Sequence, residues 1–463
     1  ILVRVFRNQN PDGDWPQWFM FFDRVRDIRA GDSHGDIVFW PLLALAQYLL
    51  GTDDAAFLEE SLPFHHPAGD ADAEHATVWQ HVERALEVIG ARVIAGTRLA
   101  AYGHGDWNDS LQPADPTFRD HLCSAWTVTL HYQTLATLAE AMRRLGRDEQ
   151  AIRFEQWAAD VLADFQRLLV KDGTVAGYAH FGAAGSVQYL LHPRDDTTGL
   201  SYSLLPMIHA ISNGMLSPEQ ARHHLALIDK HLLGPDGARL FDRPMRYRGG
   251  PQRSFQRAES SSFFGREIGL MYTHAHLRYA EALWHCGDAD GFFRALCQVV
   301  PIFLDTRVPQ ATRRQANCYY SSSDAGFADR YEAYSQYDRV SAGHIQLDGG
   351  WRIYSSGAGI ATALIFRCFL GLRVERSRLV IDPAIPKDLD GLRAALLLAD
   401  IRIEITYRIE ARGCGVVALE HDGRELSFAR LDNPYRIGGA EVSLTALRQR
   451  AAGGTAQLTV QVG

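Results

Sequence analysis

The sequence predicts a mainly helical protein, a ring of helical hairpins followed by a small all-β domain. Between about residues 36 and 371, apolar residues recur at three- and four-residue steps between loops rich in glycine and proline, which indicates helices with one buried face. After about residue 375, apolar and polar residues alternate as they do in β-strands. We therefore expect two domains, 1–375 and 376–463, with the long loops of the helical part gathered at one mouth of the ring.

The individual elements follow from these two periodicities. In 148–170, for example, Phe154, Val161 and Phe165 recur at helical spacing, and Gly146 ends the segment before it. The expected helices are 37–50, 76–95, 121–145, 148–170, 199–213, 218–232, 269–286, 289–304 and 356–371. The expected strands include 378–383, 401–407 and 457–462.

Composition excludes several classes of protein. Of the 463 residues, 46% are hydrophobic and 22% charged, which fits a globular protein with a large core, and the formal net charge of −8 gives no basic surface for nucleic acid. No segment offers the roughly 18 consecutive apolar residues of a membrane span. Six scattered cysteines without a CxxC pair indicate a reducing compartment and no cysteine zinc site. No signal peptide is visible, and the start at Ile1 without methionine indicates a fragment or a polypeptide whose beginning lies upstream.

The segment 103–110, Gly-His-Gly-Asp-Trp-Asn-Asp-Ser, carries the strongest chemical signal. It places Asp106 and Asp109 three residues apart around Trp107. An aromatic ring packs on the apolar face of a pyranose while a carboxylic acid protonates the leaving oxygen, so this pattern predicts a sugar-cleaving site. The alternative, in which the aspartates cap the next helix, stays open here.

Two further loops carry charged residues of the same kind. In 29–36, Arg29 and Asp36 either hold sugar hydroxyls by charge-assisted hydrogen bonds or, for Asp36, cap the following helix. The loop 253–276 combines Glu259, Glu267 and His274. A lone histidine on a helix is usually a core or surface residue, but His274 follows a charged, serine-rich loop, so a ligand role stands beside that interpretation.

A fourth loop, 331–358, has the features of an anion site. It ends in glycines, Ser355 and Ser356 at the start of a predicted helix, where free N–H groups and the helix dipole favour a phosphate. No lysine follows, so this is not a nucleotide-binding P-loop, and the implied anion is free phosphate or a phosphate monoester. The plain alternative is the serine- and glycine-rich start of a buried helix.

Taken in order, these loops resemble those of the inverting β-glucoside phosphorylases of glycoside hydrolase family 94, and within it most closely the β-1,2-oligoglucan phosphorylases. Residues 105–109 match the catalytic signature of the family, and 332–336 and 349–357 resemble its phosphate-site segments. Residues 267–274 look like its Glu-Asn-Gly-Gly-x-x-x-His stretch, with departures at Ile268 and Leu270.

The resemblance implies an (α/α)6 barrel followed by a β-sandwich. The upstream Arg-Asp-x-x-Gln-type segment and the N-terminal β-sandwich of the family have no counterpart, so the barrel is expected to be incomplete at its N-terminus. Asp109 then matches the general acid and Trp107 the wall of the donor-sugar subsite. The implied phosphate ligands are His274, Gln336, Ser355 and Ser356, and the expected sugar contacts are Trp107, Asp106, Arg29, Asp36, Glu259 and Glu267.

The expected reaction is reversible phosphorolysis of β-linked gluco-oligosaccharides, with β-1,2-glucan as the expected substrate, to α-glucose 1-phosphate and a shortened sugar. Phosphate is already an anionic nucleophile, so a single carboxyl suffices, and burial or nearby negative charge should raise the pKa of Asp109 so that it can donate. Inorganic phosphate is the co-substrate, and no metal or other cofactor is expected. A homodimer and a cytoplasmic location are further expectations. The alternatives are an inverting hydrolase with Glu259 or Glu267 as base, and a non-catalytic carbohydrate-binding fragment.

Overall fold

The computed structural model describes residues 1–25, 28–246, 248–261, 265, 268–302, 304–350, 353–375, 377–451 and 454–463. The chain divides into two compact units. Unit 1 comprises Ile1–Pro206 and Met245–Ser261, and unit 2 comprises Met207–Pro244 and Ser262–Gly463. This division differs from the boundary at residue 375 that the sequence suggests between a helical and a β domain. That boundary stays a prediction.

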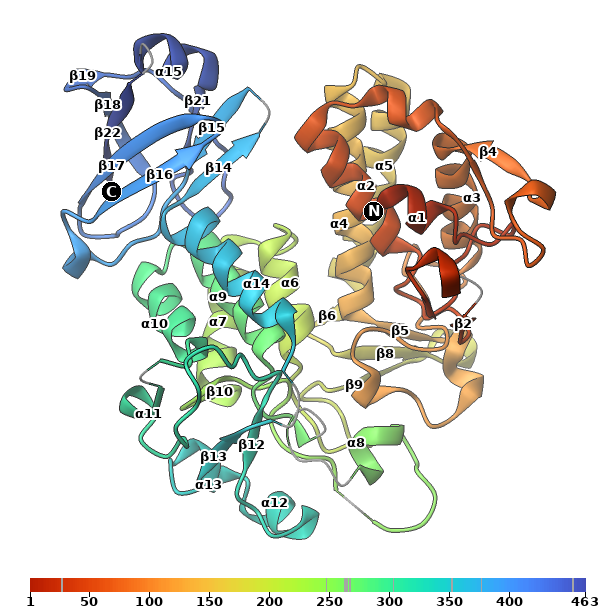
Figure 1. Cartoon of the computed structure of the whole chain (residues 1–463). Helices are drawn as coiled ribbons and strands as arrows, with labels where there is room; N and C mark the ends of the chain where they lie inside the picture. Colours follow the sequence, from red (N-terminus) through yellow and green to blue (C-terminus); the bar gives the residue numbers. More distant parts are fainter. Residues whose placement is uncertain are drawn as a thin grey trace. The chain divides into compact units, whose positions relative to one another are not determined.

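Three helices form the centre of unit 1. Figure 1 shows α2, α4 and α5 side by side, and α4 and α5 form an antiparallel hairpin around Gly146, whose φ of 72° suits a left-handed turn. A capping box of Thr77 and Gln80 starts α3. The helices are α1 (Leu2–Phe6), α2 (Phe39–Thr52), α3 (Val78–Ala91), α4 (Ala125–Arg144), α5 (Asp148–Asp164) and α8 (Gln256–Ser260), and α6 (Leu204–Ser212) crosses into unit 2.

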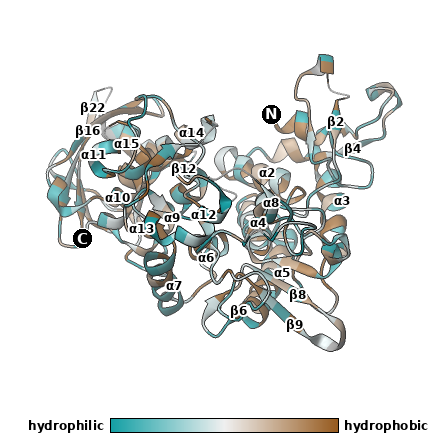
Figure 2. Cartoon of the chain, turned by 90° about the horizontal axis from the view of Figure 1, so that it is seen from below, coloured by the Kyte–Doolittle hydropathy of each residue, from teal (hydrophilic) through white to brown (hydrophobic). Residues whose placement is uncertain are grey.

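The helices expected in this unit are present, with two local differences. The segment expected to start a helix at residue 121 first forms a short strand, β5 (Leu122–Ser124), and α5 gives way to a π-helical turn at Phe165–Leu169. Figure 2 shows hydrophobic and hydrophilic residues side by side along the helices, as expected for elements with one buried face. The other strands are β1 (Trp18–Phe19), β2 (Arg29–Ala30), β3 (Ser61–Pro63), β4 (His75–Thr77), β6 (Val170–Lys171), β7 (Thr174–Val175), β8 (Tyr178–Phe181) and β9 (Val187–Leu190), of which β8 pairs with both β5 and β9.

In unit 2, helix α9 packs against α10 and α14. The helices are α7 (Pro218–His231), α9 (Thr273–Cys286), α10 (Ala289–Val299), α11 (Leu304–Arg307), α12 (Arg330–Gln336), α13 (Asp338–Ser341) and α14 (Ser355–Leu364), which continues as a π-helical turn at Ile365–Phe369. Two small antiparallel sheets of two strands accompany them, the hairpin of β10 (Leu233–Gly234) with β11 (Gly237–Ala238), and the pair of β12 (Ser323–Ala325) with β13 (Leu347–Gly349), between which α12 and α13 lie in the sequence.

The C-terminal part of unit 2 forms two sheets around one hydrophobic core. In β17 the residues alternate strictly, with Ile403, Ile405 and Tyr407 buried, so the period of two expected from the sequence is confirmed. The four-stranded sheet has the order β14 (Leu372–Glu375), β15 (Arg378–Ile381), β21 (Ala440–Ser443) and β20 (Ala429–Arg430). The five-stranded sheet has the order β16 (Arg393–Leu398), β17 (Ile401–Ile409), β22 (Thr455–Val462), β18 (Val416–His421) and β19 (Arg424–Glu425), with β17 and β22 parallel and helix α15 (Leu444–Ala451) before β22.

The fold is therefore rich in helices with added sheet, as the sequence predicts. Among the described residues, no helix is long and apolar enough to cross a membrane. Within the same residues, no group of three or more His, Cys, Asp or Glu side chains is arranged to hold a metal ion.

Candidate active site

The Asp109 loop is fixed in unit 1 by close backbone contact with the loop around His34. The amide of Gly35 donates to the carbonyl of Gly105 at 2.8 Å, and His34 pairs with Gly103 as an isolated β-bridge. A Cβ on Gly105 would lie 2.9 Å from the imidazole of His34, and its φ is 154°. Glycine at this position thus brings the His34 ring directly against the loop that carries Asp109.

Asp106 points into the interior of unit 1. It is 2% exposed, and its carboxylate accepts hydrogen bonds from the Asn108 amide at 2.8 Å and the Thr127 hydroxyl at 3.2 Å. Burial raises the pKa of Asp106 to about 6, with a smaller contribution from the charge of Asp109, while these hydrogen bonds oppose the shift. These contacts stabilise the turn that presents Trp107 and Asp109, and the sugar contact expected for Asp106 stays a prediction.

Asp36 is also buried, at 3% exposure, and it does not cap the following helix. The N-cap of α2 is Val38, without a side-chain cap. The Asp36 Oδ2 accepts from the Trp40 indole N–H at 3.1 Å, whereas Oδ1 is buried without a hydrogen-bond partner among the described residues. Burial, and then the neighbouring Asp106, raises the pKa of Asp36 to about 7. A buried carboxyl that keeps its proton near neutrality is suited to donate to a ligand hydroxyl.

Asp109 is the accessible carboxyl of this loop, with 30% of its side chain exposed. It starts a short 3-10 turn, Asp109–Leu111, whose N-cap Asn108 makes no side-chain cap bond, so the helix-capping alternative does not describe it. Its Oδ2 accepts a hydrogen bond from Arg257 Nη1 of α8 at 2.6 Å. The sequence gives no indication of this partner, because Arg257 lies 148 residues further along the chain.

A row of three tryptophans lies beside the carboxyl groups. The rings of Trp107 and Trp126 are 6.1 Å apart with planes tilted by 40°, and Trp126 and Trp40 have the same separation and tilt. Trp126 is 5% exposed and Trp40 is 41% exposed. Sequence reasoning singled out Trp107 but missed Trp40 and Trp126. The position of Trp40, one helical turn after Asp36, was the available signal.

Two of the side chains expected to bind sugar, Arg29 and Glu259, form hydrogen bonds with other residues of the chain. Arg29 donates from Nη2 to the Asn8 carbonyl at 3.2 Å and to Asn10 Oδ1 at 2.5 Å, and its pKa is lowered by burial. Glu259 accepts three backbone N–H groups, those of residues 253, 254 and 255, at 2.8, 2.5 and 2.7 Å. Arg29 therefore ties its strand to the segment around Asn8 and Asn10, whereas Glu259 holds its own loop, and the sugar contacts of both stay predictions. Glu267 lies outside the described residues.

In unit 2, His274 and Ser356 line one small pocket. His274 is the second residue of α9 and Ser356 the second of α14, so both come from the first turn of a helix. A Cβ on Gly357 would lie 3.3 Å from Thr273 Cγ2, which shows how closely the two helix starts approach. The lining residues that the structure describes are Tyr272, Thr273, His274, Tyr320, Ser321, Tyr354, Ser356 and Gly357, and none of these is acidic.

The segment 319–323 joins the two helix starts. On the α9 side, the Thr273 amide donates to the Ser321 carbonyl at 2.9 Å and the Thr273 hydroxyl to the Tyr320 carbonyl at 2.6 Å. On the α14 side, the Gly350 amide donates to the Ser322 carbonyl at 2.7 Å, and Tyr320 pairs with Ile353. These main-chain contacts fix the geometry of the pocket.

The electrostatics of this pocket favour a neutral imidazole. Burial, and then the charge of Arg278 one turn further along α9, lowers the pKa of His274 to about 4. Two other residues expected to bind phosphate, Ser355 and Gln336, are not among the described lining residues of this pocket. Ser355 is exposed and is not part of the lining, and Gln336, at the end of α12, accepts a hydrogen bond from Arg339. Their phosphate roles stay predictions.

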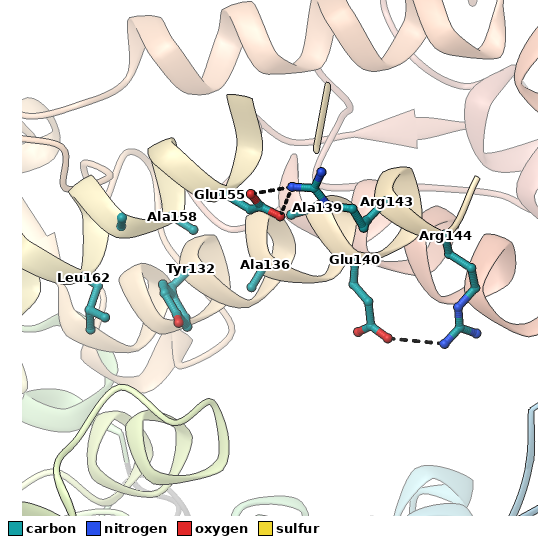
Figure 3. A pocket seen from close by; sticks show the side chains of 10 residues that line it. Tyr132, Ala136, Ala139, Glu140, Arg143, Arg144, Glu155, Ala158 and Leu162 are labelled. Carbon is teal, nitrogen blue, oxygen red and sulfur yellow. Dashed lines mark hydrogen bonds and ion pairs between the residues drawn. The ribbon is translucent and has the colours of Figure 1, made fainter. Parts of the chain in front are cut away.

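A larger pocket, of about 680 Å³, lies elsewhere in unit 1, on the α4–α5 hairpin (Figure 3). Two ion pairs lie along it, one between Arg143 of α4 and Glu155 of α5 and one between Arg144 and Glu140 on α4. None of the expected site residues lines this pocket, so its size does not make it the candidate site. The lining residues are Tyr132, Ala136, Ala139, Glu140, Arg143, Arg144, Glu155, Ala158, Ala159 and Leu162.

Three known proteins with similar sequences are named as phosphorylases. The chain is 38% identical over 441 residues to a 1,2-beta-oligoglucan phosphorylase of Listeria innocua serovar 6a, an alignment that covers 95% of this chain and 40% of that protein. It is 25% identical over 392 residues to a cellobionic acid phosphorylase of Neurospora crassa, covering 80% of this chain and 44% of the relative. A third relative, an N,N'-diacetylchitobiose phosphorylase of Vibrio proteolyticus, is 22% identical over 225 residues, which are 47% of this chain and 25% of the relative.

The chain thus spans less than half the length of the curated relatives it matches. The catalytic domain of the glycosyl hydrolase 94 superfamily matches residues 22–322, which include the Asp109 loop, α8 and the start of α9. The chain belongs to the glycosyl hydrolase 94 superfamily.

Proposed function

We propose that this chain carries the reaction centre of an inverting phosphorylase that cleaves β-linked gluco-oligosaccharides, with β-1,2-linked chains as the preferred substrate. The products are α-glucose 1-phosphate and an oligosaccharide one unit shorter. The 38% identity to a 1,2-beta-oligoglucan phosphorylase supports this substrate class. The observation that carries the proposal is the pocket at the starts of α9 and α14, which His274 and Ser356 line and whose described lining residues include no carboxylate.

The chemistry of that pocket suits inorganic phosphate. Helix N-termini present free N–H groups and the positive end of the helix dipole, and both favour an anion. Neutral His274 still donates a ring N–H to a phosphate oxygen, and the Ser356 hydroxyl donates a second hydrogen bond. Since none of the described lining residues carries a carboxylate, a phosphate dianion meets no like charge among them.

The residues of the Asp109 loop suit the sugar side of the reaction. Asp109 donates its proton to the departing glycosidic oxygen, while a phosphate oxygen forms a bond to the anomeric carbon from the opposite face. The bond between the anomeric carbon and the leaving oxygen breaks, and the configuration inverts. In synthesis Asp109 accepts a proton from the acceptor hydroxyl. Trp107 packs against the donor sugar, and protonated Asp36 is suited to bind one of its hydroxyls.

The finer features of the architecture are part of the same proposal. We expect the helices to form an (α/α)6 barrel and the two C-terminal sheets to be a β-sandwich. A homodimer and a cytoplasmic location stay predictions.

A panel of β-linked glucobioses and glucotrioses, incubated with and without phosphate, tests the activity. We expect α-glucose 1-phosphate to form only with phosphate, and fastest from the β-1,2-linked sugars. Release of free glucose at equal rates without phosphate would instead identify an inverting hydrolase. Calorimetric binding of the sugars without turnover at any phosphate concentration would identify a carbohydrate-binding protein.

A further inference from the structure

Another pocket of unit 1 lies at the base of the Asp109 loop. It has a volume of about 250 Å³, and Gly103 and His104 of that loop line it together with Gln112, residues of the segment 113–119 and Gln256 of α8. Sites for drug-sized ligands have volumes of roughly 300–1,000 Å³. The smaller volume here suits one pyranose unit rather than a whole oligosaccharide.

Hydrogen bonds join the segments that form the walls of this pocket. The Gly103 amide donates to the Arg119 carbonyl at 3.0 Å. The Gln256 amide donates to the Gln112 carbonyl at 2.9 Å, and Gln112 Nε2 donates to the His104 carbonyl at 2.8 Å. The walls therefore hold one another in place, and binding a ligand here requires little further ordering of the chain.

The polar groups of the lining are of mixed sign. Arg119 is exposed, and its guanidinium has no hydrogen-bond or ion-pair partner among the described residues, while Asp115 adds a carboxylate. Gln112 and Gln256 donate from Nε2 to main-chain carbonyls, and their own amide oxygens can accept from a ligand. Hydroxyl groups both donate and accept hydrogen bonds, so this lining suits a neutral sugar better than an anion or a cation.

The pocket shares α8 with the accessible carboxyl of the site. Gln256 lines the pocket, and the next residue, Arg257, donates to Asp109 Oδ2 at 2.6 Å. Trp107, which is proposed to pack on the donor sugar, is not among the described lining residues. The pocket is therefore suited to the other part of the oligosaccharide, the part that leaves when the bond is broken.

We propose that this pocket binds one glucose unit of the leaving part, beyond the unit attached to the scissile bond, and thereby sets a preference for chain length. The inference rests on the proposed function. The unit attached to the scissile bond lies within hydrogen-bond reach of the proposed acid, Asp109. Asp109 is not among the described lining residues, so the pocket suits a unit further along the chain.

The first test removes the Arg119 side chain. A glucobiose has a single leaving unit, so it does not reach the pocket, whereas a glucotriose does. Arg119→Ala should therefore raise the ratio of the KM for β-1,2-glucotriose to the KM for β-1,2-glucobiose by about threefold to tenfold, the cost of one hydrogen bond. The kcat should change little, because the ground state and the transition state make this contact equally.

A second variant fills the pocket without removing a polar group. Ala114 lines the pocket, and its amide donates to the Ser254 carbonyl at 2.9 Å, a main-chain contact that a larger side chain retains. Ala114→Leu should raise the same KM ratio, and Arg119→Lys should restore part of the loss seen in Arg119→Ala. The control is Arg98→Ala, which removes a 60% exposed side chain of the same unit that is not among the described lining residues.

The experiment measures KM and kcat for both sugars in all of these variants. An unchanged KM ratio in Arg119→Ala overturns the inference, even if Ala114→Leu does not fold. A fall in kcat that is equal for both sugars, without a change in the ratio, also overturns it and assigns Arg119 a purely structural role.

Calorimetric titration with β-1,2-glucotriose in the absence of phosphate separates this inference from the proposed function. Weaker binding in Arg119→Ala than in Arg98→Ala supports the pocket as a sugar site. If the unsubstituted protein binds the sugar in this way but shows no phosphorolysis, the proposed function fails and the sugar pocket stands. Binding that is equal in the two variants overturns the pocket and leaves the proposed function in place.

Discussion

The Asp109 loop of unit 1 and the His274 pocket of unit 2 differ in the kind of polar group that they contain. Around Asp109, two buried carboxyls, Asp36 and Asp106, have raised pKa values of about 7 and about 6. Around His274, none of the described lining residues is acidic, and their polar groups are hydroxyls, helix amides and an imidazole whose pKa is lowered to about 4.

This difference suits the two regions to different tasks in the proposed reaction, proton transfer at the Asp109 loop and anion binding at the His274 pocket. Buried carboxyls with raised pKa values exchange their protons closer to neutral pH than exposed carboxyls do, so they can donate to or accept from sugar hydroxyls there. Helix starts and neutral side chains bind a doubly charged anion without exchanging protons with it. In the proposed reaction, the pH dependence of the rate should therefore depend mainly on the Asp109 loop, and the affinity for phosphate mainly on the His274 pocket.

The largest effect is expected from Asp109→Asn, which removes the exchangeable proton and leaves the shape of the loop. Turnover in both directions should fall by about 10²–10⁴-fold, the usual contribution of a general acid or base. Rates of α-glucose 1-phosphate formation and consumption measure it. A variant that retains full activity would show that the proton comes from another group.

His274→Ala should act on phosphate affinity. Loss of a hydrogen bond to a charged ligand raises the KM for phosphate by about 10–100-fold, with a smaller effect on the pH profile. Steady-state kinetics over a range of phosphate concentrations measure it. The matched control is His223→Ala, at an exposed position of α7. An unchanged KM in the His274 variant would remove this residue from the anion site.

Asp36→Asn tests the stability consequence of a raised pKa. From the ordinary value of 3.8 to about 7, the folded state keeps a proton on Asp36 that the unfolded state has lost, so folding stability falls as pH rises through this window. The fall is about 1.4 kcal/mol per pH unit at most. Asparagine cannot ionise, so Asp36→Asn should unfold at a higher temperature than the unsubstituted protein at pH 8, with little difference at pH 4.

Thermal unfolding at both pH values measures this difference, and Asp120→Asn at an exposed position is the control. An Asp36→Asn variant that is less stable at pH 8 would contradict the burial argument. Its activity should nevertheless fall, because Asp36 is also proposed to bind the donor sugar.

The smallest effect is expected from the two serines at the start of α14. Ser356 lines the pocket and Ser355 does not, so Ser356→Ala should raise the KM for phosphate by about threefold to tenfold, the cost of one hydroxyl hydrogen bond, and Ser355→Ala by less. The ratio of the two KM values measures how deep the anion lies. Equal effects would show that phosphate reaches beyond the pocket to the exposed side of the helix.

The helices and the C-terminal strands were predictable because their signals are local. The period of two in β17 and the three- and four-residue steps in α5 depend only on which side of an element is buried. The π-helical turn after Asp164 was not predictable, since Phe165 and Leu169 are buried there by packing that no local period encodes. The closed ring of hairpins is likewise a long-range property, and it stays a prediction.

The site was predictable to the extent that it lies within single loops. Asp109, Trp107, His274 and Ser356 were identified from contiguous motifs, and the structure brings His274 and Ser356 into one pocket. The contact of Arg257 with Asp109 depends on two segments far apart in the chain. The contacts of Glu259 with its own loop were easier to predict from the sequence, because its backbone donors lie only four to six residues before it.

The segment 319–323 has a consequence for how this family diversifies. It connects α9 and α14 through carbonyl and amide groups, with Thr273 as the one contributing hydroxyl. Backbone groups are the same in every amino acid, so substitutions at Tyr320 or Ser321 would reshape the pocket wall while the helices keep their spacing. If the pocket binds phosphate as proposed, substitutions in this wall would adjust its affinity for the anion while the backbone keeps the two helix starts in place.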